Sequence, residues 1–188
     1  MPISDHHRRL RDSAVDYARA GWPILPVETP TADRLICGRC PPDPQTAHEW
    51  WTDEPYGIAC RTGEVLDAVE MPSQLGELVL PALEQHGAVA VVEVPLTGRW
   101  LFLVTPGAPR ITDLPADSGV RLRGRGWWIL LPPTVIIGGT VSWIGRSGPD
   151  CRLPHSMTVQ WAALRALSCL RRRAAEHVSE HATGQVTS

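Results

Sequence analysis

The apolar residues in the middle of the chain occur in short runs separated by proline and glycine, and this pattern limits the fold more than any other feature. Each run has the length of a strand and is too short for an ordinary helix. The tetrapeptide at 95–98, Pro-Leu-Thr-Gly, separates two runs and is typical of a hairpin turn. The last long stretch is either two strands or one strand bent around Gly124 and Gly126. The expected strands are 22–27, 56–60, 65–69, 88–94, 100–104, 120–125, 127–131 and 141–143.

Three segments with helical patterns are interspersed with these strands. Residues 4–20 begin at Ser4, a good N-cap residue, and end before Gly21. Residues 72–87 and 158–177 repeat apolar side chains at helical spacing. The order of helix, strands, helix, strands and helix predicts the α+β class, with a mostly antiparallel sheet.

Length and composition indicate one globular domain. The chain has 188 residues, of which 43% are apolar and 20% charged. It has no run of about 20 apolar residues, which a membrane helix would need. Residues 1–10 are too polar for the apolar segment of a signal peptide. We therefore expect a cytoplasmic protein that does not enter a membrane.

The charged residues exclude some classes of function. The 18 basic residues are all arginine, and there are 20 acidic residues. The resulting net charge of −2 does not by itself indicate a nucleic-acid binder. Such binding would need a local basic patch. A chain without lysine cannot hold a P-loop, which requires one. The five cysteines are an odd number and do not suggest a disulfide framework in a cytoplasmic protein.

A set of short motifs in a defined order resembles a known family. The motifs are Tyr17-Ala18-Arg19-Ala20-Gly21-Trp22-Pro23, Cys37-Gly38-Arg39-Cys40, Trp50-Trp51, Thr62-Gly63, Thr97-Gly98-Arg99-Trp100, Arg123-Gly124-Arg125-Gly126, Pro132-Pro133-Thr134 and Trp143. Over about 14–145 they resemble the bifunctional DNA primase/polymerase N-terminal domain of the archaeo-eukaryotic primase superfamily, in its short actinobacterial form. The resemblance implies a primase-polymerase-like fold over 1–155, flanked by helices. We expect a C-terminal helix at 156–181 packed on that domain, and a disordered tail at 182–188.

Active members of that family hold Mg²⁺ or Mn²⁺ on carboxylates and transfer nucleotides to a 3′-hydroxyl. The family pattern is two Asp residues two positions apart on one strand, because such side chains point to the same face. Here the corresponding acids are Asp67 and Glu70, three positions apart. On a regular strand they face opposite ways, and only a bulge or a strand end would bring them together. They are either rearranged metal ligands or two solvated carboxylates.

Two further family positions also differ from the pattern. The resemblance places Trp100 where the family has a His that contacts the nucleotide, and Arg121 where it has a third Asp. Trp100 either stacks on a base or belongs to the sheet core. An Arg in the position of Arg121 repels a metal ion rather than binding it. The sequence therefore predicts a degenerate catalytic site.

Arginines alternate along one predicted strand. If 121–125 is a strand, then Arg121, Arg123 and Arg125 share one face, and Arg99 joins them from the neighbouring hairpin. Such a row suits a phosphate backbone. The alternative is a solvated sheet face. Its balancing acids would be Asp113, Asp117 and Glu93.

The Pro-rich segment 29–55 is expected to be a long loop with metal-ligand spacing. Cys37 and Cys40 have the spacing of half a zinc site, and His48 is a third candidate ligand. The fourth ligand is open, with Cys60, His6 and His7 as candidates. The alternative is a pair of free thiols at the surface.

Three hypotheses on function follow. The first is a primase-polymerase-like domain that binds single-stranded or primed DNA or nucleotides, with nucleotidyl transfer impaired. The second is an active DNA primase/polymerase with a rearranged acidic site. The third is an interaction or regulatory module with a protein partner of the replication type. Its contact surface would use Trp50, Trp51, Trp127, Trp128 and Trp161. The sequence leaves the oligomeric state open.

Overall fold

The computed structural model describes residues 4–41, 43–145 and 148–184, with side chains described up to 172. None of its helices within these residues is long and apolar enough to cross a membrane. The helices are α1 (Asp5–Arg19), α2 (Pro44–Asp53), α3 (Ser73–Glu84) and α4 (Ser156–Gly184), with a short 3₁₀ turn at Ala116–Ser118. The strands are β1 (Ile24–Val27), β2 (Gly57–Arg61), β3 (Asp67–Pro72), β4 (Val91–Val94), β5 (Arg99–Val104), β6 (Arg121–Arg123), β7 (Trp128–Leu131), β8 (Val135–Ile136), β9 (Gly139–Thr140) and β10 (Ser142–Trp143).

The α+β prediction is confirmed, but the strands form two main sheets. One sheet has the order β1-β2-β7, and the other has the order β10-β4-β5-β3-β6. Strands β8 and β9 form a separate small ribbon. Every strand pair is antiparallel. The predicted segments 120–125 and 127–131 become β6 and β7, which lie in different sheets, so the chain crosses between the sheets at Gly124–Gly126.

The prediction of a continuous loop over 29–55 is wrong, because residues 44–53 form α2. Asp43 caps this helix by accepting the Thr46 N–H at 2.8 Å, and Pro44 occupies the first turn, where its missing N–H costs nothing. The hydrogen bonds from the N–H and the hydroxyl of Thr46 lower the pKa of Asp43. Trp51 is fully buried, with Ala47 one turn before it. This two-residue apolar face is too short to stand out in a Pro-rich sequence.

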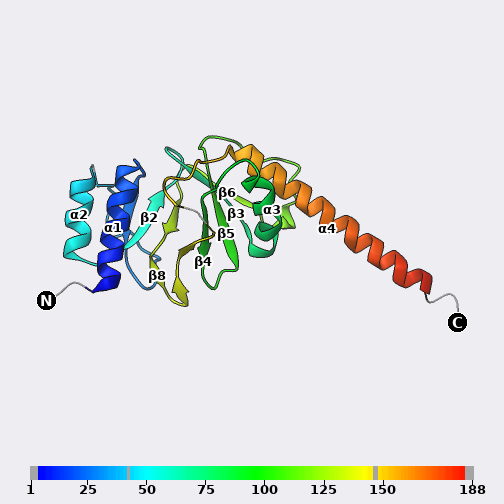
Figure 1. Cartoon of the computed structure of the whole chain (residues 1–188), viewed down its shortest axis with the longest axis horizontal. Coiled ribbons are helices and arrows are strands. Elements are labelled where there is room, and N and C mark those ends of the chain that lie inside the picture. The colour runs from blue at the N-terminus through cyan, green and yellow to red at the C-terminus, as the bar shows by residue number, and fades with distance from the viewer. Residues whose placement is uncertain (1–3, 42, 146–147, 185–188) are drawn as a thin grey trace.

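One apolar core lies between α1, α2 and the two sheets. Figure 1 shows α1 and α2 side by side at one end of the molecule. The His7 Nε2–H donates to the Trp51 carbonyl at 2.7 Å and joins these helices. Tyr17 stacks on Trp22 with ring centroids 5.3 Å apart, and its hydroxyl donates to the Pro132 carbonyl at 2.7 Å. These contacts fix α1 on the sheets.

A second apolar core lies on the other face of the five-stranded sheet, beneath α3 and α4 (Figure 1). Met71 and Phe102 from the sheet pack against Val79 of α3 and Val159 of α4. Helix α4 continues to Gly184, past the expected 158–177, and Figure 1 shows its C-terminal part extending beyond the sheets. Of the expected disordered tail, residues 185–188 lie outside the described residues.

Thr134 provides a test of how the core is held, because its buried side chain hydrogen-bonds twice to one residue of β2. Its hydroxyl accepts the Ile58 N–H at 2.7 Å and donates to the Ile58 carbonyl at 3.1 Å. We predict that Thr134→Val lowers the free energy of unfolding by about 2–3 kcal/mol, because both backbone groups lose a partner. Thr134→Ser keeps the hydroxyl and should cost about 1 kcal/mol for the lost methyl. Urea denaturation measures both, and equal losses would contradict the prediction.

Candidate active site in the cleft between the sheets

Strand β3 sends its two acidic side chains to opposite faces of the five-stranded sheet. Side chains alternate along a strand, so Asp67 shares its face with Val69 and Met71, on the side of α3 and α4. Glu70 shares its face with Ala68, on the side of the other sheet. Strand β3 pairs without interruption with β5 from Asp67 to Pro72 and with β6 from Ala68 to Glu70, and it has no bulge that would bring the carboxylates together.

Glu70 is held between two arginines. Its Oε1 accepts a hydrogen bond from the Nε–H of Arg99, and its Oε2 accepts one from the Nε–H of Arg123 at 2.5 Å. Arg99 also donates to the Gly119 carbonyl. The Glu70 side chain is 8% exposed, and the two arginine side chains are 23% and 19% exposed. Since burial reduces screening by water, these are charge-assisted hydrogen bonds in a partly desolvated place.

The register of the strands adds a third arginine to the same face. Arg121 of β6 lies directly opposite Glu70, and Arg123 lies opposite Ala68. On the other side, Arg99 of β5 lies opposite Pro72. Directly opposite residues in antiparallel strands point to the same face. The positions two before and two after Glu70 are Ala68 and Pro72, which have no side chain that could bind a metal ion. Each of them lies opposite an arginine.

A cavity of about 360 Å³ opens at this face, between the two sheets. The guanidinium carbon of Arg123 lies 4.4 Å from the ring centroid of Trp127, a residue that is 53% exposed. The cavity thus combines guanidinium groups with an accessible indole. Its lining residues are Ala32, Glu70, Val94, Thr97, Arg99, Leu101, Arg123, Trp127, Trp128, Ile129 and Leu130.

Residues 14–156, which span both sheets and this cleft, match the family model described as bifunctional DNA primase/polymerase, N-terminal. The chain belongs to the Prim-Pol family. A comparison with curated proteins finds no match. The primase/polymerase-like fold that the motifs imply is therefore shown, and the family generally works with divalent metal ions.

The residues of this Prim-Pol cleft do not fit a pair of divalent metal ions. Two-metal chemistry needs neighbouring carboxylates with free oxygens. Here Asp67 faces away from the cleft, and both oxygens of Glu70 are engaged by guanidinium groups. Across the described ranges, no three His, Cys, Asp or Glu side chains group closely enough to hold a metal ion. We therefore derive no catalytic step through a metal at this cleft.

Two residues of the predicted binding surface lie elsewhere. Trp100 is 8% exposed and belongs to the core beneath α3, where its ring packs closely on Gly76. Strand alternation explains this, because Arg99 faces the cleft and its neighbour must face the helices. Arg125 was expected on one face with Arg121 and Arg123, but β6 ends at Arg123. Arg125 lies in the following turn, beside a different hollow that Asp67 lines.

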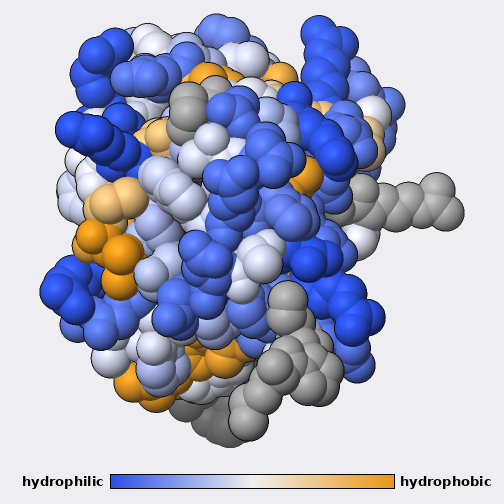
Figure 2. All heavy atoms as spheres, turned by 90° about the vertical axis from the view of Figure 1, so that its left-hand side faces the viewer, coloured by the Kyte–Doolittle hydropathy of each residue, from blue (hydrophilic) through white to orange (hydrophobic). Residues whose placement is uncertain are grey.

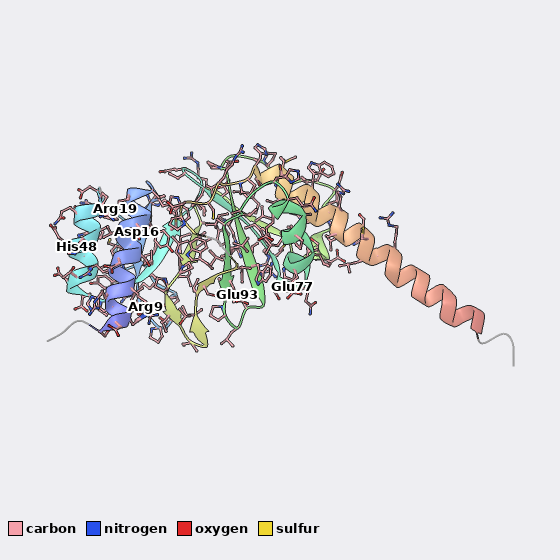
Figure 3. The ribbon with its side chains drawn as sticks, in the orientation of Figure 1. Arg9, Asp16, Arg19, His48, Glu77 and Glu93 are labelled. Carbon is pink, nitrogen blue, oxygen red and sulfur yellow. The ribbon has the colours of Figure 1, made fainter. Side chains whose placement is uncertain are left out.

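The predicted zinc ligands do not come together. His48 lies exposed on α2, at the end of the molecule opposite α4 (Figure 3). Cys37 and Cys40 are half-buried in the preceding segment, and Cys60 is fully buried in the core. Burial raises the pKa of both Cys40 and Cys60. His48 is therefore not grouped with Cys37 and Cys40, and these two are free thiols in the structure.

The tryptophans named for a contact surface do not share one environment. Trp51 is fully buried in the core, whereas Trp127 and Trp161 are 53% and 46% exposed. Figure 2 looks onto the end of the molecule formed by α1 and α2, which is mostly hydrophilic with small, separate apolar spots. Because Trp51 is fully buried, Trp50 and Trp51 cannot form a shared contact surface at the α1 and α2 end.

A substitution of Glu70 tests whether the ion cluster of Glu70, Arg99 and Arg123 stabilises the fold. We predict that Glu70→Gln lowers the free energy of unfolding by about 2 kcal/mol, because two partly buried guanidinium groups lose their counter-charge. The matched control is Glu93→Gln, on the other face of the same sheet in β4, where Figure 3 shows it. Urea denaturation at low and high salt measures both variants. A loss no larger than that of the control would show that the cluster contributes nothing.

Proposed function

We propose that this Prim-Pol domain binds the phosphate groups of single-stranded or primed DNA, or of nucleotides, in the cleft, and that it has lost metal-dependent nucleotidyl transfer. The observation that carries the proposal is the cluster around Glu70. At the centre of the cleft face, one carboxylate is neutralised by Arg99 and Arg123, and Arg121 adds a further positive charge.

The charge balance of the cleft supports anion binding. Arg99, Arg123 and Glu70 line the cavity, and Arg121 lies beside them on the same sheet face, so this surface is net positive although the whole chain carries −2. Guanidinium groups bind phosphate oxygens through two parallel hydrogen bonds. Glu70 occupies only the Nε–H of each bound arginine, and it orients the remaining N–H groups. Glu70 is thus a positioning residue for the arginines.

Trp127 supports the choice of a nucleic acid or nucleotide over a simple anion. Its indole is half exposed beside the guanidinium of Arg123, at the rim of the cavity. Stacking of a base on an aromatic side chain is independent of base identity and is common in proteins that bind single strands. A phosphate on Arg121 or Arg123 with a base on Trp127 uses both features of the cavity.

Arg121 gives the sharpest test of binding, because it is exposed and belongs to no ion pair among the described residues. We predict that Arg121→Gln weakens binding of a labelled single-stranded oligonucleotide. The slope of log K against log salt should fall by about 1, as expected for one lost phosphate contact. Arg125→Gln is the matched control, since Arg125 is also exposed but lies in the turn after β6, beside a different hollow. If both variants changed the affinity and the salt slope equally, the phosphate contact would not be at Arg121.

Primer extension tests the loss of transfer. We expect no extension of a labelled template-primer with all four dNTPs, in either Mg²⁺ or Mn²⁺, while the same oligonucleotide still binds in EDTA. The physical reason is that Glu70 alone, between two arginines, cannot hold two metal ions. Metal-dependent extension that disappears in Glu70→Gln would overturn the proposal and establish the active-enzyme hypothesis instead.

A further inference from the structure

Asp67 is buried on the face of β3 that the cleft does not use. The residue is 2% exposed. Its Oδ2 accepts the Gly107 N–H at 3.0 Å, and its Oδ1 has no hydrogen-bond partner among the described residues. A buried carboxylate oxygen without a donor is costly, and native structures rarely keep one without a reason.

This carboxylate lines a hollow of about 300 Å³, which is separate from the cleft. That volume is at the small end of the range for small-molecule sites. The walls are mainly backbone and small side chains, so a ligand can approach closely. They comprise Gly63, Asp67, Gly107, Ala108, Pro109, Leu122, Gly124 and Arg125.

The walls of the hollow are fixed by hydrogen bonds from buried side chains. Gln160 of α4, 1% exposed, donates to the Pro109 carbonyl at 3.0 Å and accepts the Ile111 N–H at 2.8 Å. On the opposite wall, the hydroxyl of Thr62 donates to the Gly124 carbonyl at 2.5 Å. These hydrogen bonds hold two walls of the hollow to neighbouring elements.

The hollow carries one charge of each sign. Arg125 lines it from the turn after β6 and is exposed, whereas Asp67 lies at its buried side. Within the described ranges neither residue takes part in an ion pair. A plain cation would be attracted by Asp67 and repelled by Arg125, and a plain anion would meet the reverse. Only a molecule with both charges uses both residues.

We propose that this hollow binds a small zwitterion of amino-acid size, with its ammonium group on Asp67 and its carboxylate on Arg125. Oδ1 has less than 1 Å² of accessible surface, so a small rotation of the Asp67 carboxyl group toward the hollow brings it to the ammonium, which supplies the N–H donor that Oδ1 lacks. The guanidinium binds a carboxylate in its usual planar way. A divalent cation fits less well, since among the described residues Asp67 is the only carboxylate that lines the hollow. The proposal does not depend on nucleic-acid binding in the cleft.

The test is a titration of the full chain followed by NMR of the Gly107 amide, which reports directly on Asp67. The probes are glycine, β-alanine, 4-aminobutyrate and 6-aminohexanoate, which differ in the spacing of their charges. Ethylammonium and propionate, with one charge each, serve as half-ligand controls. We expect a saturable shift with at least one zwitterion and at least about tenfold weaker binding of both half-ligands, because each lacks one charge-assisted contact.

Three variants separate the contributions. Asp67→Asn keeps the shape and an acceptor for Gly107, and it should weaken binding about tenfold or more. Arg125→Gln should weaken it about threefold, because an exposed contact is screened by water. Gly124→Ala should abolish binding without unfolding the chain. The added Cβ would lie 3.7 Å from Oδ2 of Asp67, an ordinary contact, and would cover the carboxylate.

The outcomes are distinct. The absence of a saturable shift with every zwitterion would overturn the proposal, as would undiminished binding in Asp67→Asn when the amide spectrum shows that this variant is folded. Ethylammonium binding as tightly as the zwitterions would refute the role of Arg125. A shift caused by dGMP in place of the zwitterions would reassign the hollow to a nucleotide. Arg19→Gln, on α1 at the far end of the molecule (Figure 3), should leave zwitterion binding unchanged.

Discussion

The alternation of side chains along β3 is the constraint on which the chemistry of this molecule depends. It separates Asp67 from Glu70 by the thickness of a sheet, although they are three residues apart. One carboxylate then lies in a cleft with arginines, and the other lines a separate hollow and has an unused oxygen. A single extra residue between them would place both on one face and change the whole charge pattern.

The ion cluster of Glu70, Arg99 and Arg123 makes the cleft suited to anions rather than to metal cations. A carboxylate between two guanidinium groups has little capacity left for a metal ion, but its partners keep most of their N–H groups. The same carboxylate keeps two like charges close together on one sheet face, which would otherwise repel. The family fold thus supports a cleft whose positive charge comes from side chains rather than from metal ions.

Sequence reasoning could predict the α+β class and most strands, because proline and glycine mark the ends of short apolar runs. It also predicted that Asp67 and Glu70 face opposite ways. It could not say which of them faces the cleft, since that depends on which side of β3 the helices cover. The partners of Glu70 are 29 and 53 residues away, so only the fold brings them together. Helix α2 was missed because its buried face is only Ala47 and Trp51.

The place where the chain passes between the sheets has a mechanical consequence. Two passages lie next to each other there, from β2 to β3 and from β6 to β7, and the side chain of Thr62 bonds to the carbonyls of Gly124 and Trp127. Covalent geometry therefore sets the separation of the two walls at this point. A rotation of one sheet against the other would therefore pivot at this point. The cleft is lined by Trp127 and the hollow by Gly124, so both border the pivot.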